Sequence, residues 1–209
     1  MFNLKSIFIS FIAILVVSLM ISNVANAGFG IKGGTTSSTW NVEVNEIEVD
    51  GQEDVSGFTA GFFFPIEVST WFTFQPELLY SQKGVAVNVA LASVCNFEFT
   101  TNYVELPILF KFSLPINDTI YPNIFLGPYA AYLIDSEMSV NGVSVDTENF
   151  LNDFDAGVLA GAGIDFKVAG HKITLEGRYS RGMVNITNVD SDNEDIKNES
   201  VMFLVGFTF

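Results

Sequence analysis

The chain has 209 residues, and its formal net charge of −15 results from 24 acidic and nine basic residues. This acidic balance argues against nucleic acid as a partner, because the phosphates would be repelled. Hydrophobic residues make up 49% of the chain, yet no segment beyond the N-terminal one has an apolar run suited to a membrane-spanning helix. Membrane-spanning strands, whose apolar residues alternate with polar ones, would account for this combination.

The first 27 residues have the organisation of a secretory signal peptide. Lys5 supplies a positive start, residues 7–21 are almost continuously apolar, and Ala25-Asn26-Ala27 is a small-x-small cleavage site. We predict that residues 1–27 are removed and that residues 28–209 form one domain. A retained anchor is the alternative, but the apolar run is short for the roughly 20 residues that a spanning helix needs. Without Lys5 the domain keeps eight basic and 24 acidic residues, a net charge of −16.

Residues 58–84 reveal the pattern of the domain. One face of residues 72–83 is apolar and rich in aromatic residues, and it contains Phe72, Phe74, Pro76, Leu78 and Tyr80. The other face is mainly polar, and it contains Thr73, Gln75, Glu77, Ser81 and Lys83. A period of two predicts a β-strand, and this division of residue types predicts lipid outside and a polar lumen inside.

The same pattern recurs along the chain and predicts eight strands. They cover residues 28–34, 57–64, 71–86, 100–114, 119–134, 154–167, 172–183 and 200–209. Short turns are expected at 65–69, 115–118 and 168–171, and long polar loops at 35–56, 88–97, 135–153 and 185–198. Because an open edge in hydrocarbon would leave backbone groups unpaired, the first strand must pair with the last. The predicted fold is all-β, an eight-stranded antiparallel up-and-down transmembrane β-barrel with both termini on the short-turn, periplasmic side.

Several of these strands resemble the outer-membrane β-barrel family that includes PorT-like proteins. The similar segments are Phe-Gly-Ile-Lys-Gly-Gly at 29–34, residues 74–84, Tyr-Val-Glu-Leu-Pro-Ile-Leu at 103–109, Gly-Pro-Tyr at 127–129 and the C-terminal Phe. The resemblance implies a barrel like OmpX or the OmpA transmembrane domain in a Gram-negative outer membrane. It also implies that Phe209 is the signal read by the barrel-insertion machinery. It carries little information about activity.

The inward faces of the predicted strands carry one dense set of charges. Its members are Lys32, Glu77, Glu105, Lys111, Asp155, Asp165, Glu176 and Arg178. An eight-stranded barrel is barely wide enough inside for its own side chains, so we predict a structural network of ion pairs that plugs the lumen. A narrow proton or ion path would use the same residues. Arg178 is the expected central cation, because a guanidinium can hold two carboxylates at once.

The sequence gives little support for catalysis. His171 falls in a predicted periplasmic turn, and no Ser or Asp is positioned by the sequence to complete a triad with it. Cys95, the only cysteine, falls in a predicted loop without a neighbouring base and cannot form an internal disulfide. We therefore predict no catalytic residue, and we expect that the protein is not an enzyme.

Two motifs suggest ligands but are incomplete. Residues 190–195 alternate oxygen-bearing side chains like a calcium loop, but they lack the glycine at the sixth position, and Val201 stands where a bidentate Glu is needed. Gly161-Ala162-Gly163 resembles the start of a dinucleotide fingerprint, but Phe166 replaces its third glycine. These glycines are instead expected to make room for inward side chains such as Tyr121 and Tyr129. We predict neither a metal nor a cofactor.

The predicted long loops are strongly acidic. Residues 35–56 carry six carboxylates, and residues 135–153 and 185–199 carry five each. They either keep neighbouring barrels apart or form a surface for cations or a basic partner. We predict a small, closed, monomeric outer-membrane barrel with a structural or surface-interaction role. Its expected partners are outer-membrane lipid, the insertion machinery and an unidentified surface or periplasmic protein. A PorT-like accessory to secretion or transport, a membrane-embedded enzyme and a narrow channel are the alternatives.

Overall fold

The computed structural model describes residues 28–44, 47–48, 52–91, 93–140, 143–146, 151–186 and 194–209. The predicted signal peptide lies outside these residues, and so does most of the calcium-like segment at 190–195. Within the described parts, no helix has the length and the apolar character needed to cross a membrane.

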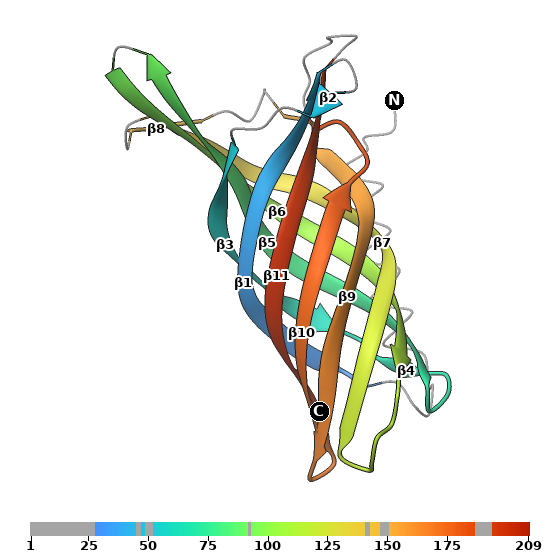
Figure 1. Cartoon of the computed structure of the whole chain (residues 1–209). Coiled ribbons are helices and arrows are strands. Elements are labelled where there is room, and N and C mark those ends of the chain that lie inside the picture. Colours follow the sequence, from blue (N-terminus) through green and yellow to red (C-terminus); the bar gives the residue numbers. More distant parts are fainter. Residues whose placement is uncertain are drawn as a thin grey trace, which may run out of the picture.

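Eight long strands form a closed wall, as the alternating pattern predicted. They are β1 (Gly30–Val44), β3 (Gln52–Phe63), β5 (Phe72–Leu91), β6 (Ser93–Ser113), β7 (Ile120–Val140), β9 (Phe154–Val168), β10 (His171–Gly182) and β11 (Glu194–Thr208). Each pairs antiparallel with the next long strand in the chain, and β11 pairs with β1 from Gly30↔Thr208 to Val44↔Glu194 (Figure 1). The all-β, eight-stranded antiparallel barrel is therefore confirmed.

Three short strands extend this wall at its two ends. They are β2 (Ile47–Glu48), β4 (Ile66–Glu67) and β8 (Val143–Asp146), and they pair with β1, β5 and β7 respectively. The β4 strand lies within the predicted turn at 65–69. In Figure 1, β8 lies at the end of the barrel opposite to the C-terminus.

The strands extend much further toward the long-loop side than predicted. β1 continues to Val44 instead of ending at Gly34, and only one residue separates β5 from β6 where a loop at 88–97 was expected. β7 and β8 likewise occupy part of the predicted loop at 135–153. The prediction was wrong because it followed apolar alternation, which belongs to the lipid-facing part of a strand, whereas backbone pairing continues beyond the membrane, where the outward face meets water. For the same reason Cys95 lies within β6, opposite Val89, and not in a loop.

The other end of the barrel carries the short turns, and it holds both ends of the described domain. Ala169 and Gly170 have φ angles of 52° and 87° and form a two-residue turn between β9 and β10. The backbone amide of Phe209 donates to the carbonyl of Phe29 over 2.9 Å, and that of Gly28 donates to the carbonyl of Pro65 over 2.9 Å. The predicted common side of the two ends is therefore correct.

The two faces of the wall differ as the alternation predicted. Phe110 is 38% exposed on the outside, whereas its neighbour Lys111 is 3% exposed on the inside. At the short-turn end Phe29 stacks on Phe62 and on Phe209, with ring centroids 5.7 and 5.8 Å apart. Such an aromatic girdle is characteristic of the interface between membrane and water.

Gly161 makes room for a different side chain than predicted, and the predicted Tyr129 lies beside Gly157 of the same strand. A Cβ on Gly161 would come within 2.5 Å of the Phe125 ring, and a Cβ on Gly157 within 2.8 Å of the Tyr129 ring. Phe125, which sequence reasoning passed over, therefore fills the space expected for Tyr121. The physical reason is cross-strand register, since Phe125 lies directly opposite Gly161.

Candidate functional site

The predicted central cation, Arg178, sits in the middle of the lumen and holds two carboxylates. Its Nη1 and Nη2 atoms donate to Glu77 Oε2 and Oε1 over 2.7 and 2.9 Å, and Nη2 also donates to Glu176 Oε1 over 2.9 Å. Lys32 donates to Glu77 Oε1 over 2.7 Å and also to Glu176. Gln75 donates to Glu77 as well. These five side chains, from β1, β5 and β10, are called the middle cluster.

The middle cluster is cut off from solvent. The side chains of Lys32, Glu77 and Glu176 are 0% exposed, and that of Arg178 is 1% exposed. The Arg178 guanidinium also lies 5.3 Å from the centroid of the Phe125 ring. Two cations thus balance two carboxylates in a dry environment, where such pairs are strongly held once formed but costly to break.

Nearer the short turns, a second ion pair crosses the lumen. Lys111 of β6 donates to Asp165 Oδ1 of β9 over 2.9 Å, and the hydroxyl of Thr174 donates to the same oxygen over 2.9 Å. Sequence reasoning placed Lys111 and Asp165 on inward faces but could not assign them to each other. Their pairing depends on the curvature that brings β6 and β9 together across β7.

Nearer the long hairpins, Lys83 is a further buried charge in the lumen, and it was not among the predicted inward charges. Its Nζ lies 2.5 Å from Glu105 Oε1, and 4.9 and 5.5 Å from the ring centroids of Tyr129 and Tyr103. Glu105 was expected near Arg178, but it pairs with Lys83 of the adjacent strand β5. Lys83 lies four positions along β5 from Leu79, the residue directly opposite Glu105, and its long side chain spans this offset. Inward alternation along β5 already placed Lys83 in the lumen.

Asp155 completes this part of the lumen. Its Oδ2 accepts hydrogen bonds from the Tyr129 hydroxyl over 3.2 Å and from Asn198 Nδ2 over 2.9 Å. Asn198 Nδ2 also donates to the Tyr103 hydroxyl over 3.3 Å. The group is called the upper chamber and consists of Lys83, Tyr103, Glu105, Tyr129, Asp155 and Asn198.

A row of hydroxyls joins the upper chamber to the wall. Thr36 and Thr59 share a hydrogen bond of 2.7 Å, the Thr59 hydroxyl donates to Ser81 over 3.1 Å, and Ser81 donates to Glu105 Oε2 over 3.2 Å. The row crosses β1, β3, β5 and β6 through neighbouring inward positions. Sequence reasoning missed it, although inward Thr and Ser residues on consecutive strands are the signal that could have revealed it.

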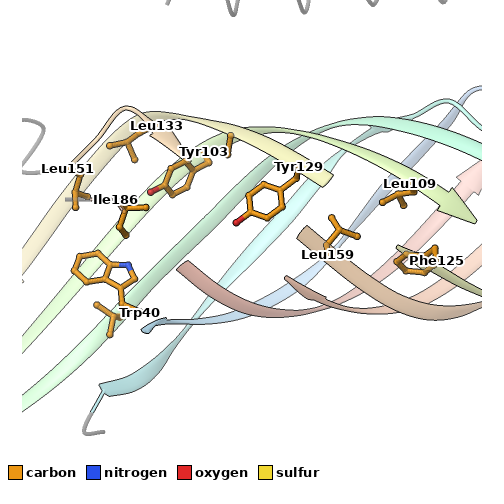
Figure 2. Close-up of a cluster of buried hydrophobic side chains, with 11 residues drawn as sticks. Trp40, Tyr103, Leu109, Phe125, Tyr129, Leu133, Leu151, Leu159 and Ile186 are labelled. Atoms are coloured by element: carbon orange, nitrogen blue, oxygen red, sulfur yellow. The ribbon is translucent and has the colours of Figure 1, made fainter. Parts of the chain in front are cut away.

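On the long-hairpin side, buried apolar side chains pack together inside the barrel. Figure 2 shows Trp40, Leu133, Leu151 and Ile186 gathered beside Tyr103. Leu151 is 3% exposed and Ile186 is 0% exposed, although both lie outside the eight long strands. Trp40, Leu133, Leu151 and Ile186 are called the outer plug.

Backbone hydrogen bonds hold the outer plug in position. The amide of Asn152 donates to the carbonyl of Ile186 over 2.8 Å, and the amide of Ile186 donates to the carbonyl of Ile196 over 2.9 Å. The amide of Leu133 donates to the carbonyl of Asp153 over 2.7 Å. Two segments that follow β7 and β10 therefore fold back over the barrel.

The short-turn end has a hollow of about 550 Å³, lined by Glu67, Asp118, Lys167, His171, Lys172 and Phe209 among others. Lys172 donates to Glu67 over 2.6 Å. Burial alone would raise the pKa of Glu67, but the hydrogen bond from Lys172 and the charges of Lys172 and Lys167 hold it below its ordinary value. The hollow is thus a polar rim with charges of both signs.

His171, one of the two residues considered for catalysis, lines the hollow at the short-turn end. His171 was predicted in a turn, but it is the first residue of β10. Its ring stacks on that of Phe207, with the ring centroids 5.2 Å apart. Within the described part of the chain, no three His, Cys, Asp or Glu side chains are grouped so as to hold a metal ion. The charged side chains of the lumen form ion pairs and hydrogen bonds that link strands.

The closed wall, the apolar exterior and the polar interior define a class of protein, the integral β-barrels of the outer membrane. Residues 22–188 match the family described as Outer membrane protein beta-barrel domain. The chain belongs to this family, and it is a small barrel of the outer membrane.

Solved structures with the same architecture are distant in sequence. OprG from Pseudomonas aeruginosa is 14% identical, with a TM-score of 0.50 over 88% of this chain and 96% of that chain. Ail from Yersinia pestis is 16% identical, with a TM-score of 0.43 over 88% and 99%. Neisserial surface protein A is 10% identical, with a TM-score of 0.48 over 88% and 99%. A comparison with curated proteins finds no match. At these identities the likeness concerns the fold alone.

Proposed function

We propose that the protein is a closed, monomeric outer-membrane barrel whose lumen is structural and whose role is exercised at the cell surface. The observation that carries the proposal is the filling of the lumen. Nine charged side chains are buried there, and the outer plug covers the mouth above them. Such an interior leaves no continuous channel for solutes of porin size.

The height of the barrel supports a role at the surface. β5, β6 and β7 have 20, 21 and 21 residues, whereas a strand crosses the membrane with roughly 9 to 11. About half of each strand therefore extends beyond the hydrocarbon. On the outward face of that extension Glu98 and Glu137 are exposed, and Asp135 accepts a hydrogen bond from Asn102. This acidic face suits a basic partner or bridging cations.

Reconstitution into planar bilayers tests the closed lumen. The unmodified protein should give no stable single-channel currents of porin size. Such currents would mean that the lumen is open, and the structural role would have to be abandoned.

The surface role is tested separately by cross-linking and pull-down from outer-membrane extracts, with a variant in which Glu98, Asp135 and Glu137 are changed to Gln or Asn. Partners retained equally by both proteins would argue against the acidic face.

A PorT-like accessory role in secretion or transport is a second candidate. It rests on the strand signatures at 74–84 and 103–109, which resemble that group. Deletion of the gene should then change the set of secreted proteins. An unchanged set would remove this candidate without affecting the structural one.

The remaining proposals concern catalysis and insertion. We propose no catalytic role, and a lipid-hydrolysis assay on the purified barrel tests this, because turnover above that of a lumen variant would contradict it.

We also propose that the insertion machinery reads Phe209, which is 62% exposed at the short-turn end. Phe209→Ser should reduce the amount of assembled barrel in the outer membrane, whereas Phe209→Tyr should preserve it.

A further inference from the structure

The buried charges of the lumen do not balance. The charged side chains that are buried in the described part of the chain are four cations, Lys32, Lys83, Lys111 and Arg178, and five carboxylates, Glu77, Glu105, Asp155, Asp165 and Glu176. The middle cluster and the Lys111–Asp165 pair are each neutral in sum. The surplus negative charge therefore belongs to the upper chamber, where Lys83 faces both Glu105 and Asp155.

Asp155 is the carboxylate of the upper chamber without an ion pair. Lys83 is held 2.5 Å from Glu105, and none of the described cations lies within ion-pair distance of Asp155. Asp155 is 0% exposed, and only its Oδ2 accepts hydrogen bonds, from Tyr129 and Asn198. Its Oδ1 is buried without a donor. A buried carboxylate in this position is costly unless a positive charge reaches it.

A second buried acceptor accompanies this oxygen. Asn198 is 2% exposed, and its Nδ2 is committed to Asp155 Oδ2 and to the Tyr103 hydroxyl. These two bonds fix the amide and leave Asn198 Oδ1 buried without a donor. The absence of a side chain at Gly182 lets the strands approach here, because a Cβ at that position would lie 3.2 Å from both Asp155 Oδ1 and the Asn198 carbonyl.

We propose that the upper chamber binds one sodium-sized monovalent cation through Asp155 Oδ1 and Asn198 Oδ1. Carboxylate and amide oxygens are the ligands that hard cations prefer. One positive charge cancels the surplus of the chamber, whereas a divalent ion would reverse its sign. A Cβ at Gly182 would lie only 3.1 to 3.2 Å from Asp155 Oδ1 and from the backbone of Asn198, and this close packing favours a small ion. The cation enters as the barrel folds and links β9 to β11 across β10. This inference does not depend on the proposed surface role.

Unfolding in urea tests the proposal on the full domain, refolded in detergent micelles. Sodium chloride, potassium chloride and choline chloride are compared at equal ionic strength, so that general screening is the same. The urea midpoint of the unmodified protein should be highest in sodium, and it should rise with sodium concentration and then saturate. Equal midpoints in sodium and choline would overturn the proposal, and equal midpoints in sodium and potassium would overturn the size argument. This step needs no variant.

Two matched variants locate the effect. Asp155→Asn removes the surplus charge and keeps the shape of the side chain, so its midpoint should be the same in all three salts. Asp165→Asn removes an equally buried carboxylate that is paired with Lys111, and it should keep the sodium response whatever its absolute stability. A sodium response that survives in Asp155→Asn would assign the ion to the acidic surface and refute the site.

Discussion

The middle cluster and the outer plug both lie inside the barrel, but they use opposite chemistry. The middle cluster is built from strand residues, such as Glu77 and Arg178, whose charges neutralise each other out of contact with water. The outer plug packs Trp40 and Leu133 of the long strands against Leu151 and Ile186, which lie outside those strands, and its contacts are apolar. The difference suggests that strand pairing depends on the charges, whereas closure of the mouth depends on segments that could be changed without dismantling the barrel.

The largest expected effect is at the middle cluster. Arg178→Ala leaves Glu77 and Glu176 buried with Lys32 as their only remaining cation in the cluster, and it should lower the free energy of unfolding by about 3 to 5 kcal/mol. Arg178→Lys keeps the charge but cannot form the two-pronged contact, so it should lose less. Urea unfolding in lipid vesicles measures both. If the two variants lose the same amount, geometry rather than charge controls the cluster.

The outer plug should respond through packing. Ile186→Ala removes a fully buried side chain and should cost about 2 to 4 kcal/mol, with faster hydrogen exchange of the amides near Asn152 and Ile196. If the two regions are independent, the combined Ile186→Ala and Arg178→Ala variant should lose the sum of the single losses within about 0.5 kcal/mol. A larger coupling energy would show that the middle cluster and the outer plug act as one unit.

β6 allows an added charge to be compared at a lipid-facing position and at the short-turn end of the same strand. Phe110 faces lipid and lies opposite Leu126, midway between Ile120 and Tyr132 on β7, whereas Lys111 next to it is buried in an ion pair. Phe110→Arg should therefore cost about 2 to 4 kcal/mol. Ser113→Arg, at the short-turn end of β6, should cost less because that position reaches water. Similar free energies of unfolding in vesicles would contradict the assignment of the two faces.

The smallest effect is expected at the short-turn rim, where charges are partly exposed. Because the folded state holds the pKa of Glu67 below its ordinary value of 4.5, the stabilisation is present above that value and is lost as the pH falls through the lower, folded pKa. An exposed pair of this kind contributes about 0.2 to 1 kcal/mol. Lys172→Met should remove this part of the acid sensitivity, measured as the difference between urea midpoints at neutral and acidic pH. An unchanged difference would mean that Lys172 has no influence on Glu67.

The sequence by itself determined the wall of this protein. Residues facing lipid must be apolar and residues facing the lumen must be compatible with a filled interior, so the period-two alternation identified the eight strands and put Lys111 inside and Phe110 outside. The inward charges were readable for the same reason. The alternation also places Lys83 and Phe125 on the inward face. It gave no indication that Lys83 would form an ion pair with Glu105 or that Phe125 would lie over Gly161.

Only the tertiary structure decided which inward residues meet and where the strands end. The pairing of Arg178 with Glu77 crosses the lumen between β10 and β5, and it depends on closure and register rather than on spacing in the chain. β1 continues to Val44 because β11 supplies hydrogen-bond partners that no local pattern records. Leu151 and Ile186 become buried only because their segments fold back over the mouth, and such long-range contacts leave no periodic signal in the sequence.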